Sequence, residues 1–377
     1  MSDYMYILES HLSPDQNRVV EAVQAAAGEA GVNVFLTGGA MRDMLAGFPI
    51  RDLDFVVEGN ALKVAHAIGG HGGARTVHLD EARKTADLLF PSGVTAQIAM
   101  SRQEKYGRGG ARPSVVPATI QEDLRGRDFT CNAIALSLNR ASRGLLLDPM
   151  NGLADIERRE LRAVSTYGFY DDPSRLLRLV RLSVRLGFAV EERTRMQLAN
   201  AREAEVETRI PPRSLSEELR RISAEDRPGE ILKGLEEAGL LKLFSPVLGS
   251  KLNHQALARL EKAEALVPDD APWRAARFGV FMQALTAGLA PKEKAALIKT
   301  TEMPKSDLTE WQKLETRAKK LESALKSARI RKASHVYQAV SAAAPDEILF
   351  TLCHSALKPV QERLRNHFGK YLAQIAE

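Results

Sequence analysis

The chain has 377 residues, of which 44% are hydrophobic and 27% are charged. This composition is typical of a folded protein with more than one domain, and it excludes a disordered or fibrous chain. The net charge of +5 is modest but compatible with a polyanionic partner. No apolar run approaches the roughly 20 residues of a membrane span, and the N-terminus lacks the pattern of a secretory signal. Cys131 and Cys353 form no disulfide or metal pattern, which favours a reducing cytoplasm.

The first 100 residues are predicted to form a mixed sheet of about five strands flanked by helices. Ser13, Pro14 and Gln16 are typical of a helix N-terminus, so a helix is expected from there to Gly31. The elements that follow are expected, in chain order, as a strand (34–37), a short helix ending at Gly47, a strand (50–57), a helix (60–68) and three β-like runs (75–79, 85–90 and 94–100). A Pro-Ser-Gly turn makes the last two runs a hairpin.

Asp52 and Asp54 are the strongest candidates for a chemical site. They lie one residue apart in a strand predicted to be buried, so both carboxylates project from the same face. Two adjacent anions repel each other unless a cation lies between them, and Mg2+ can bind carboxylate and phosphate oxygens together. Upstream, Gly38 and Gly39 would let backbone amides approach a phosphate, and Arg42 would add a bidentate donor. The pattern predicts metal-dependent phosphoryl or nucleotidyl transfer; the alternative is a solvated pair at a strand end.

A stretch rich in glycine, proline and arginine follows the predicted sheet. Between residues 101 and 118 the alternating strand pattern ends, and basic residues are interspersed among the glycines and prolines. Loops of this length are uncommon without a function. A mobile basic loop with a function is therefore expected, and an ordinary surface excursion is the alternative.

The chain after about residue 145 is predicted to be helical to its end, and one of its helices is rich in arginine. Its arginines fall within one stripe about 120° wide, opposite leucines and valines. They are Arg175, Arg178, Arg181 and Arg185. Guanidinium groups gathered on one surface repel each other, which predicts an anionic partner such as a triphosphate or a nucleic-acid backbone.

Three ordered motifs resemble those of the class II tRNA nucleotidyltransferases and bacterial poly(A) polymerases. They are Gly-Gly-Ala-Met-Arg-Asp followed by Asp-x-Asp (38–54), Arg-Asp-Phe-Thr-Cys-Asn-Ala (127–133) and Asp-Asp-Pro-Ser-Arg-Leu-Leu-Arg (171–178). The resemblance implies an α+β fold, in which a polymerase-beta-like nucleotidyltransferase head precedes helical neck, body and tail domains. The implied boundaries are 1–144 for the head, 145–210 for the neck, 211–300 for the body and 301–377 for the tail. Body and tail would bind RNA, with a shortened tail, because no Gly-Pro element follows Tyr371.

The resemblance also implies roles for single residues. Asp52 and Asp54 would be catalytic and hold Mg2+. Asp172 and Arg175 would read the base edge of the nucleotide in place of a template, which would accept A and C. The full set expected to bind the nucleotide is Gly38, Gly39, Arg42, Arg127, Asp128, Asn132, Asp172, Arg175, Arg178 and Arg181. In that set Arg127 would contact phosphate and Asp128 the ribose 2′-hydroxyl; the structural alternatives are a surface pair for these two and a helix cap for Asp172.

Two positions depart from the family pattern. Gln97 stands where the family has a third carboxylate, and glutamine is neither a base nor a strong magnesium ligand. Either the two aspartates suffice, or Asp87 or Glu104 substitutes, or the protein mainly binds RNA. Asp171 stands where the family usually has glutamate, so its neighbour Asp172 is expected to matter more.

The resemblance therefore predicts a CCA tRNA nucleotidyltransferase that uses CTP, ATP and Mg2+ on tRNA and implies no protein partner. A partial enzyme that adds only A or only CC is the nearest alternative. A poly(A) polymerase is less favoured, because the Arg-Arg-Phe-x-Leu-x-His signature of that branch is represented only by Arg-Thr-Val-His-Leu at 75–79. A catalytically weak RNA-binding protein is the alternative from a different class.

Overall fold

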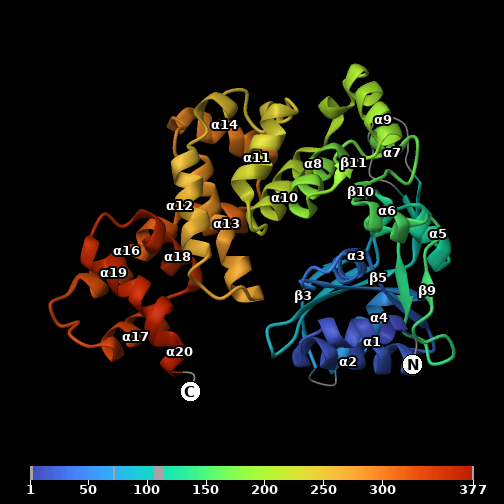
Figure 1. The fold of residues 1–377 in the computed structure, drawn as a ribbon, viewed down its shortest axis with the longest axis horizontal. Coiled ribbons are helices and arrows are strands. Elements are labelled where there is room, and N and C mark those ends of the chain that lie inside the picture. Colours follow the sequence, from blue (N-terminus) through green and yellow to red (C-terminus); the bar gives the residue numbers. More distant parts are fainter. Residues whose placement is uncertain (1–2, 71–72, 106–113, 376–377) are drawn as a thin grey trace. The chain divides into compact units, whose positions relative to one another are not determined.

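The computed structural model describes residues 3–70, 73–105 and 114–375, and the chain divides into two compact units. The first unit comprises residues 1–179 and 187–209, and the second comprises residues 180–186 and 210–377. Figure 1 follows the chain through its helices and strands. The finer division into head, neck, body and tail stays a prediction.

A mixed sheet of seven strands forms the centre of the first unit, among the residues that the structure describes. Its strands are, in spatial order, β3 (Arg75–Asp80), β4 (Thr85–Leu89), β5 (Thr95–Met100), β2 (Leu53–Glu58), β1 (Asn33–Thr37), β8 (Ala135–Ser137) and β9 (Leu146–Leu147). β2 and β5 are parallel, whereas the other neighbours are antiparallel. The predicted mixed sheet is confirmed, but the expected number of strands was too small, because β8 and β9 extend the sheet beside β1.

Capping residues set the two ends of the first long helix. α2 (Pro14–Ala30) begins after Ser13, whose side chain accepts a hydrogen bond from the amide of Gln16, and it ends at Gly31 in the left-handed conformation. The helix predicted there is confirmed. The other elements of this unit are α1 (Asp3–His11), α3 (Gly38–Leu45), α4 (Ala61–Gly70), α5 (Ile120–Arg125), a 3-10 turn (Thr130–Asn132), α6 (Gly152–Arg158), β10 (Glu160–Leu161), α7 (Gly168–Asp171), the start of α8 (Arg175–Leu186), β11 (Ala189–Val190), α9 (Glu192–Glu203) and a 3-10 turn (Val206–Arg209).

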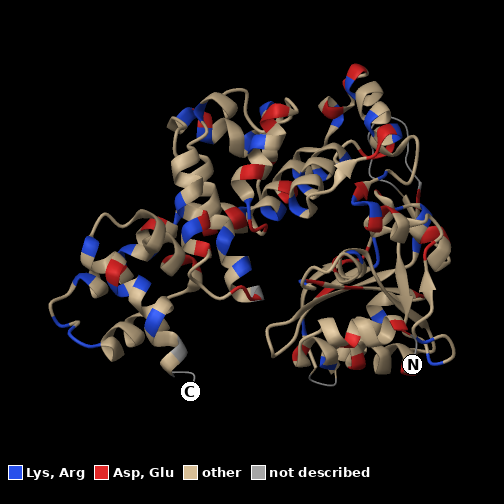
Figure 2. Cartoon of the chain, viewed as in Figure 1, with Lys and Arg blue, Asp and Glu red and all other residues tan. Residues whose placement is uncertain are grey.

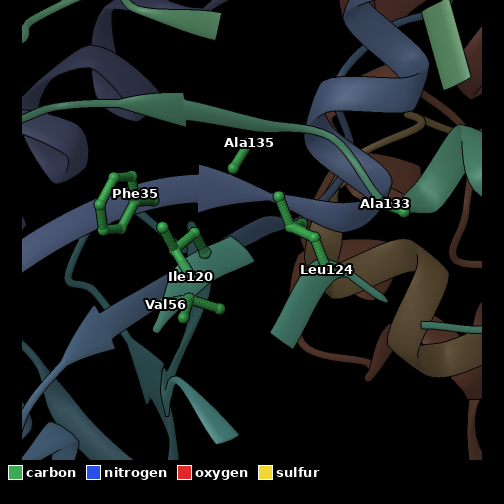
Figure 3. Close-up of a cluster of buried hydrophobic side chains, with 6 residues drawn as sticks. All are labelled: Phe35, Val56, Ile120, Leu124, Ala133 and Ala135. Atoms are coloured by element: carbon green, nitrogen blue, oxygen red, sulfur yellow. The ribbon is translucent and has the colours of Figure 1, made fainter. Parts of the chain in front are cut away.

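An apolar cluster fixes α5 against strands of the sheet (Figure 3). Its buried side chains are Phe35, Val56, Ile120, Leu124, Ala133 and Ala135. Complete burial of a large aliphatic or aromatic side chain contributes roughly 1.5–3 kcal/mol. The cluster therefore determines where the chain leaves α5, and the next residues include Arg127 and Asp128 of the second motif.

The predicted loop at residues 101–118 begins and ends in paired strands. β6 (Arg102–Lys105) and β7 (Ser114–Pro117) are antiparallel neighbours in a separate two-stranded sheet. The prediction of an irregular stretch is therefore wrong at both ends, where backbone hydrogen bonds join the two segments. The part between them, residues 106–113, lies outside the described residues.

The second unit is helical, as predicted, over the residues that the structure describes (Figure 1). Besides the end of α8, its helices are α10 (Pro212–Ser223), α11 (Pro228–Glu237), α12 (His254–Glu264), α13 (Ala271–Leu285), α14 (Pro291–Thr301), α15 (Lys305–Gln312), α16 (Leu314–Lys326), α17 (Ala333–Ser341), α18 (Pro345–His354), α19 (Lys358–Asn366) and α20 (Leu372–Ile375), with 3-10 turns at Leu241–Leu243 and Gly249–Lys251 and a π-helix at His367–Tyr371. No described helix of the protein is long and apolar enough to cross a membrane.

Two arginines of α8 are neutralised inside the second unit. Arg181 is 7% exposed, and it donates to Glu218 at 2.6 Å and to Glu225 at 3.0 Å. The Nε atom of Arg185 lies 3.4 Å from the other carboxylate oxygen of Glu225. The prediction that the whole arginine stripe needs an external anion is therefore wrong for these two residues. Arg181, which was expected to bind the nucleotide, is held in this buried ion pair.

Arg181→Ala is expected to destabilise the second unit by about 3–5 kcal/mol, because it leaves Glu218 and Glu225 buried without a compensating charge. Urea unfolding followed by circular dichroism measures the change. The matched control is Arg195→Ala, because the Arg195 side chain is 61% exposed and pairs with surface Glu192. Its expected effect is below about 1 kcal/mol. An Arg181 effect as small as that of the control would contradict the prediction.

Glu264, at the end of α12, is a buried acid with poor compensation. Neither of its carboxylate oxygens has a hydrogen-bond partner among the described residues, and the Nε atom of Arg277 is 3.7 Å from one of them. Burial raises the pKa of Glu264 to about 8, and the positive charge of Arg277 offsets only part of this rise. Negative charges on Glu261, Asp226 and Asp269 raise the pKa further. The folded protein therefore favours the protonated form of Glu264.

The stability of the second unit is expected to fall between about pH 4.5 and pH 8, because the folded state holds a proton on Glu264 that the unfolded state releases. The stability is fully present below the unfolded pKa and is lost as the pH rises through the folded pKa. Glu264→Gln cannot ionise, so it should exceed the wild type in stability at about pH 9, by on the order of 5 kcal/mol. Urea unfolding at about pH 5 and pH 9 tests this, and a difference independent of pH would contradict it.

Candidate active site

The two candidate catalytic aspartates lie beside the turn between β1 and α3. Asp52 is exposed just before β2, whereas Asp54 is half-buried within β2, in register with Gln97 of β5. Gly38 has a φ of +63°, and a Cβ atom there would lie 3.1 Å from Oδ2 of Asp54. The Gly39 amide donates to the same oxygen at 3.4 Å. Glycine at position 38 thus lets the backbone close over Asp54.

The electrostatics of Asp52 and Asp54 favour a bound cation. Burial, and then the adjacent charge of Asp52, raise the pKa of Asp54 to about 6. Arg127 and Arg42 offset part of this rise. Carboxylate oxygens are ligands that hard divalent ions accept, and such an ion would relieve the repulsion. Across the described part of the chain, no three His, Cys, Asp or Glu side chains gather as a metal site, so an ion held by the pair would take further ligands from water or substrate.

Arg127 is fixed beside the glycine turn by Asp123. The Nε and Nη2 atoms of Arg127 donate to one oxygen of Asp123 at 2.9 and 2.7 Å. The Nη1 atom lies 3.7 Å from the place that a Cβ atom of Gly38 would occupy. Asp123 also accepts from the Arg102 amide at the start of β6. Arg127 is thus held with one amino group directed at the turn beside Asp54.

Residues from the first and second motifs form one chain of hydrogen bonds. Arg42 is buried and donates to Asp43 at 2.7 Å and to the Asn132 oxygen at 2.8 Å. The Asn132 nitrogen donates to Asp128 at 2.9 Å, and Arg178 donates to the other oxygen of Asp128 at 2.7 Å. These bonds hold Arg42 within the protein, where it orients Asn132. They also show that Asp128 pairs with Arg178 and does not form a surface pair with its neighbour Arg127.

Two physical effects oppose each other at Asp128. Burial disfavours its charged form, but the guanidinium groups of Arg178 and Arg175 hold the pKa of this carboxyl well below its usual range. Asp128 therefore stays ionised and can only accept hydrogen bonds. It accepts from Arg178, from Asn132 and from the amide of Phe129.

Asp172 connects the third motif to this network. One carboxylate oxygen accepts from the Ser174 amide at 3.1 Å, which supports the start of α8. The other lies 3.6 Å from Nη2 of Arg178 and 3.8 Å from Nε of Arg175. Arg175 is 7% exposed, and its guanidinium donates to the backbone carbonyl of Gly126 at 3.1 Å. The helix cap expected at Asp172 is therefore wrong, because Ser174 itself stands at the N-cap position of α8. One oxygen of Asp172 binds Ser174, and the other faces two arginines.

Two acidic residues that hold Arg127 and Arg42 in place were not among the residues predicted from the sequence. Asp123 precedes Arg127 by four residues, and this spacing is typical of a helical ion pair, so the signal was present. Asp43 follows Arg42 directly, and adjacent residues on a helix do not ordinarily face each other, so its pairing had no such signal.

Comparison with known proteins gives this network a context. Residues 34–162 match the family described as the poly(A) polymerase head domain. The A-adding tRNA nucleotidyltransferase of Halalkalibacterium halodurans is 32% identical over 70% of this chain and 61% of its own length. The CC-adding tRNA nucleotidyltransferase of Deinococcus radiodurans is 38% identical over 54% of this chain and 53% of its own. The chain thus spans less than two thirds of either curated relative.

A solved structure extends the similarity to the full chain. The Thermotoga maritima CCA-adding enzyme, in complex with tRNA, matches 100% of this chain and 86% of its own, with 25% sequence identity and a TM-score of 0.58. The similarity therefore includes the helical second unit as well as the sheet.

Proposed function

Because the chain belongs to the class II tRNA nucleotidyltransferase and poly(A) polymerase family, we propose that it transfers CMP and AMP from CTP and ATP to the 3′ end of tRNA and releases pyrophosphate. The observation that carries this proposal is the convergence of three sequence motifs in the first unit. The glycine turn closes over Asp54, Arg127 lies beside that turn, and Asp128 joins the first motif to the start of α8. Reactions of this class depend mostly on positioning and charge neutralisation, and this pre-arranged network suits both.

Nucleotidyltransferases of this family are generally metal-dependent. We assign Mg2+ to Asp52 and Asp54, because burial and then repulsion by Asp52 raise the pKa of Asp54, and both residues offer oxygen ligands. When bound, Mg2+ would neutralise triphosphate charge and favour ionisation of the RNA 3′-hydroxyl. The protein's own contribution is to hold the two carboxylates together, with the Arg127 guanidinium beside them as a hydrogen-bond donor to the nucleotide phosphates.

Asp128 and Asp172 supply the groups for nucleotide selection. A carboxylate has about four lone-pair sites, and Asp128 uses three of them on Phe129, Asn132 and Arg178. The remaining site suits the ribose 2′-hydroxyl. The Asp172 oxygen that faces the arginines can accept from the exocyclic amine of adenine or cytosine, and a guanidinium can donate to the adjacent ring nitrogen.

The second unit offers a basic surface for the RNA backbone. Figure 2 shows lysines and arginines on α16 and on the segment that follows it. The exposed cations there are Lys319, Lys320, Lys326, Arg329, Arg331 and Lys332, and Lys313 lies directly before α16. Phosphate contacts of this kind give affinity without sequence preference, which suits tRNA as a substrate class. Both cysteines are buried and free, which is compatible with a reducing cytoplasm.

The test uses purified protein and radiolabelled tRNA that ends at the discriminator base, with Mg2+ and with CTP and ATP separately and together. Addition of three nucleotides only when both are present supports the proposal. Addition of C alone, or of A alone to tRNA that already ends in CC, would assign a partial enzyme. A long A tail would assign a poly(A) polymerase. Binding of tRNA without incorporation would overturn the enzymatic proposal in favour of an RNA-binding protein.

A further inference from the structure

Three polar residues lie side by side across three neighbouring strands at the candidate site. Asp54 of β2 is in register with Gln97 of β5, and Gln97 is in register with Asp87 of β4. Cross-strand partners in register place their side chains on the same face of a sheet. Gln97 therefore lies between two carboxylates, one of which is a proposed metal ligand.

The Gln97 carboxamide has a defined orientation. Its Nε2 atom donates to Oδ1 of Asp87 at 2.8 Å. An ionised carboxylate can only accept hydrogen bonds, so Asp87 selects the nitrogen of the carboxamide and not its oxygen. Because the group is planar and its two polar atoms diverge, the oxygen turns away from β4. It accepts no hydrogen bond from any residue that the structure describes.

We propose that Asp87 is a positioning residue, which fixes Gln97 so that its carboxamide oxygen accepts a hydrogen bond from the RNA 3′-hydroxyl that attacks the nucleotide. The proposal rests on the nucleotidyltransferase function proposed above. Gln97 takes no proton, because an amide oxygen is not a base near neutral pH; it orients the hydroxyl beside Asp52 and Asp54. Proper orientation of a reacting group is a recognised source of rate enhancement.

The arrangement also accounts for glutamine at this position. A glutamate at residue 97 would face Asp87 directly across the strand pair, and like charges in that position repel. With glutamine at residue 97, β4 keeps the negative charge of Asp87, and β5 offers a neutral hydrogen-bond acceptor. The competing explanation is a solvent-facing pair of no consequence, because Gln97 is exposed. The two explanations predict different rates when Asp87 and Gln97 are replaced singly and together.

A double-mutant cycle separates them, with Asp87→Ala, Gln97→Ala and the double variant assayed on the same tRNA. If Asp87 acts through Gln97, each single variant should lower kcat by about tenfold, and the double variant should be no slower than Gln97→Ala. KM for CTP, ATP and tRNA should stay within about twofold. Glu81→Gln, an exposed acid in the turn after β3, is the charge-matched control and should keep the wild-type kcat. Wild-type kcat in Asp87→Ala, or losses that multiply in the double variant, would overturn the proposal.

A second measurement needs neither metal nor turnover. The side-chain amide resonances of Gln97, identified by their absence from Gln97→Ala, report the hydrogen bond to Asp87 in the free protein. They should shift in Asp87→Ala and stay unchanged in Glu81→Gln; resonances that do not move in Asp87→Ala would show that Asp87 does not orient the carboxamide. If the wild-type protein adds no nucleotide at all, the proposed function fails, and this spectroscopic test still decides the positioning.

Discussion

Asp54→Asn is expected to reduce nucleotide addition by at least about a thousandfold, or roughly 4 kcal/mol of transition-state stabilisation. The reason is that Asp54 is the carboxylate over which the glycine turn closes, and Asp52 alone would hold a divalent ion less tightly. Binding of tRNA should stay within a few-fold of wild type, because the phosphate contacts proposed for the second unit are untouched. Single-turnover incorporation and a filter-binding titration measure the two quantities.

Loss of the fold cannot imitate this result. Asp54 is a carboxyl whose charged form is disfavoured by burial and by Asp52, so a neutral amide should leave the protein as stable as the wild type or more so. Urea unfolding of the variant checks this expectation. Glu21→Gln, an exposed position on α2 with the same change in charge, should leave activity unchanged. More than a tenth of wild-type activity in Asp54→Asn would refute the assignment of this residue as a metal ligand.

Local patterns predicted the elements that surround the site. The capping residues Ser13 and Gln16 defined the start of α2, an apolar run located β2, and β-like runs on either side of a turn signal located β4 and β5. These signals act over a few residues and are therefore readable in sequence. The strands β8 and β9 lack such a signal, because they are only three and two residues long and too short to show a recognisable strand pattern.

Partners that come from distant segments could not be predicted. The 3.6-residue period places Arg178 and Arg181 on one stripe of α8, but it does not say what lies opposite each of them. Arg178 meets Asp128, 50 residues earlier, whereas Arg181 meets Glu218, 37 residues later. Only the first of these two arginines therefore belongs to the hydrogen-bonded network of the candidate site. The sequence was equally silent about the partner of Arg42. Its motif indicated a hydrogen-bond donor to phosphate, whereas the folded chain buries it against Asn132.

Asp172→Asn is expected to shift nucleotide choice from CTP toward UTP, in addition to slowing the reaction. The oxygen that accepts from the Ser174 amide can be kept by asparagine, so this contact just before α8 is retained. The second oxygen becomes an amide nitrogen, which donates to the O4 atom of uracil instead of accepting from the amine of cytosine. The ratio of kcat/KM for CTP over UTP should therefore fall by roughly ten- to a hundredfold, equivalent to about 1–3 kcal/mol.

The adjacent Asp171→Asn is the matched control, because Asp171 is exposed and carries the same charge. It should leave the CTP to UTP ratio at its wild-type value. If Asp172 served only to bind Ser174, Asp172→Asn would preserve both the rate and the ratio. If it served only to balance Arg175 and Arg178, all four nucleotides would weaken together. A change in the CTP to UTP ratio is thus the specific sign that the Asp172 side chain reads the base. Measured kcat/KM values for CTP, ATP, UTP and GTP on one tRNA primer decide among base reading, binding of Ser174 and charge balance.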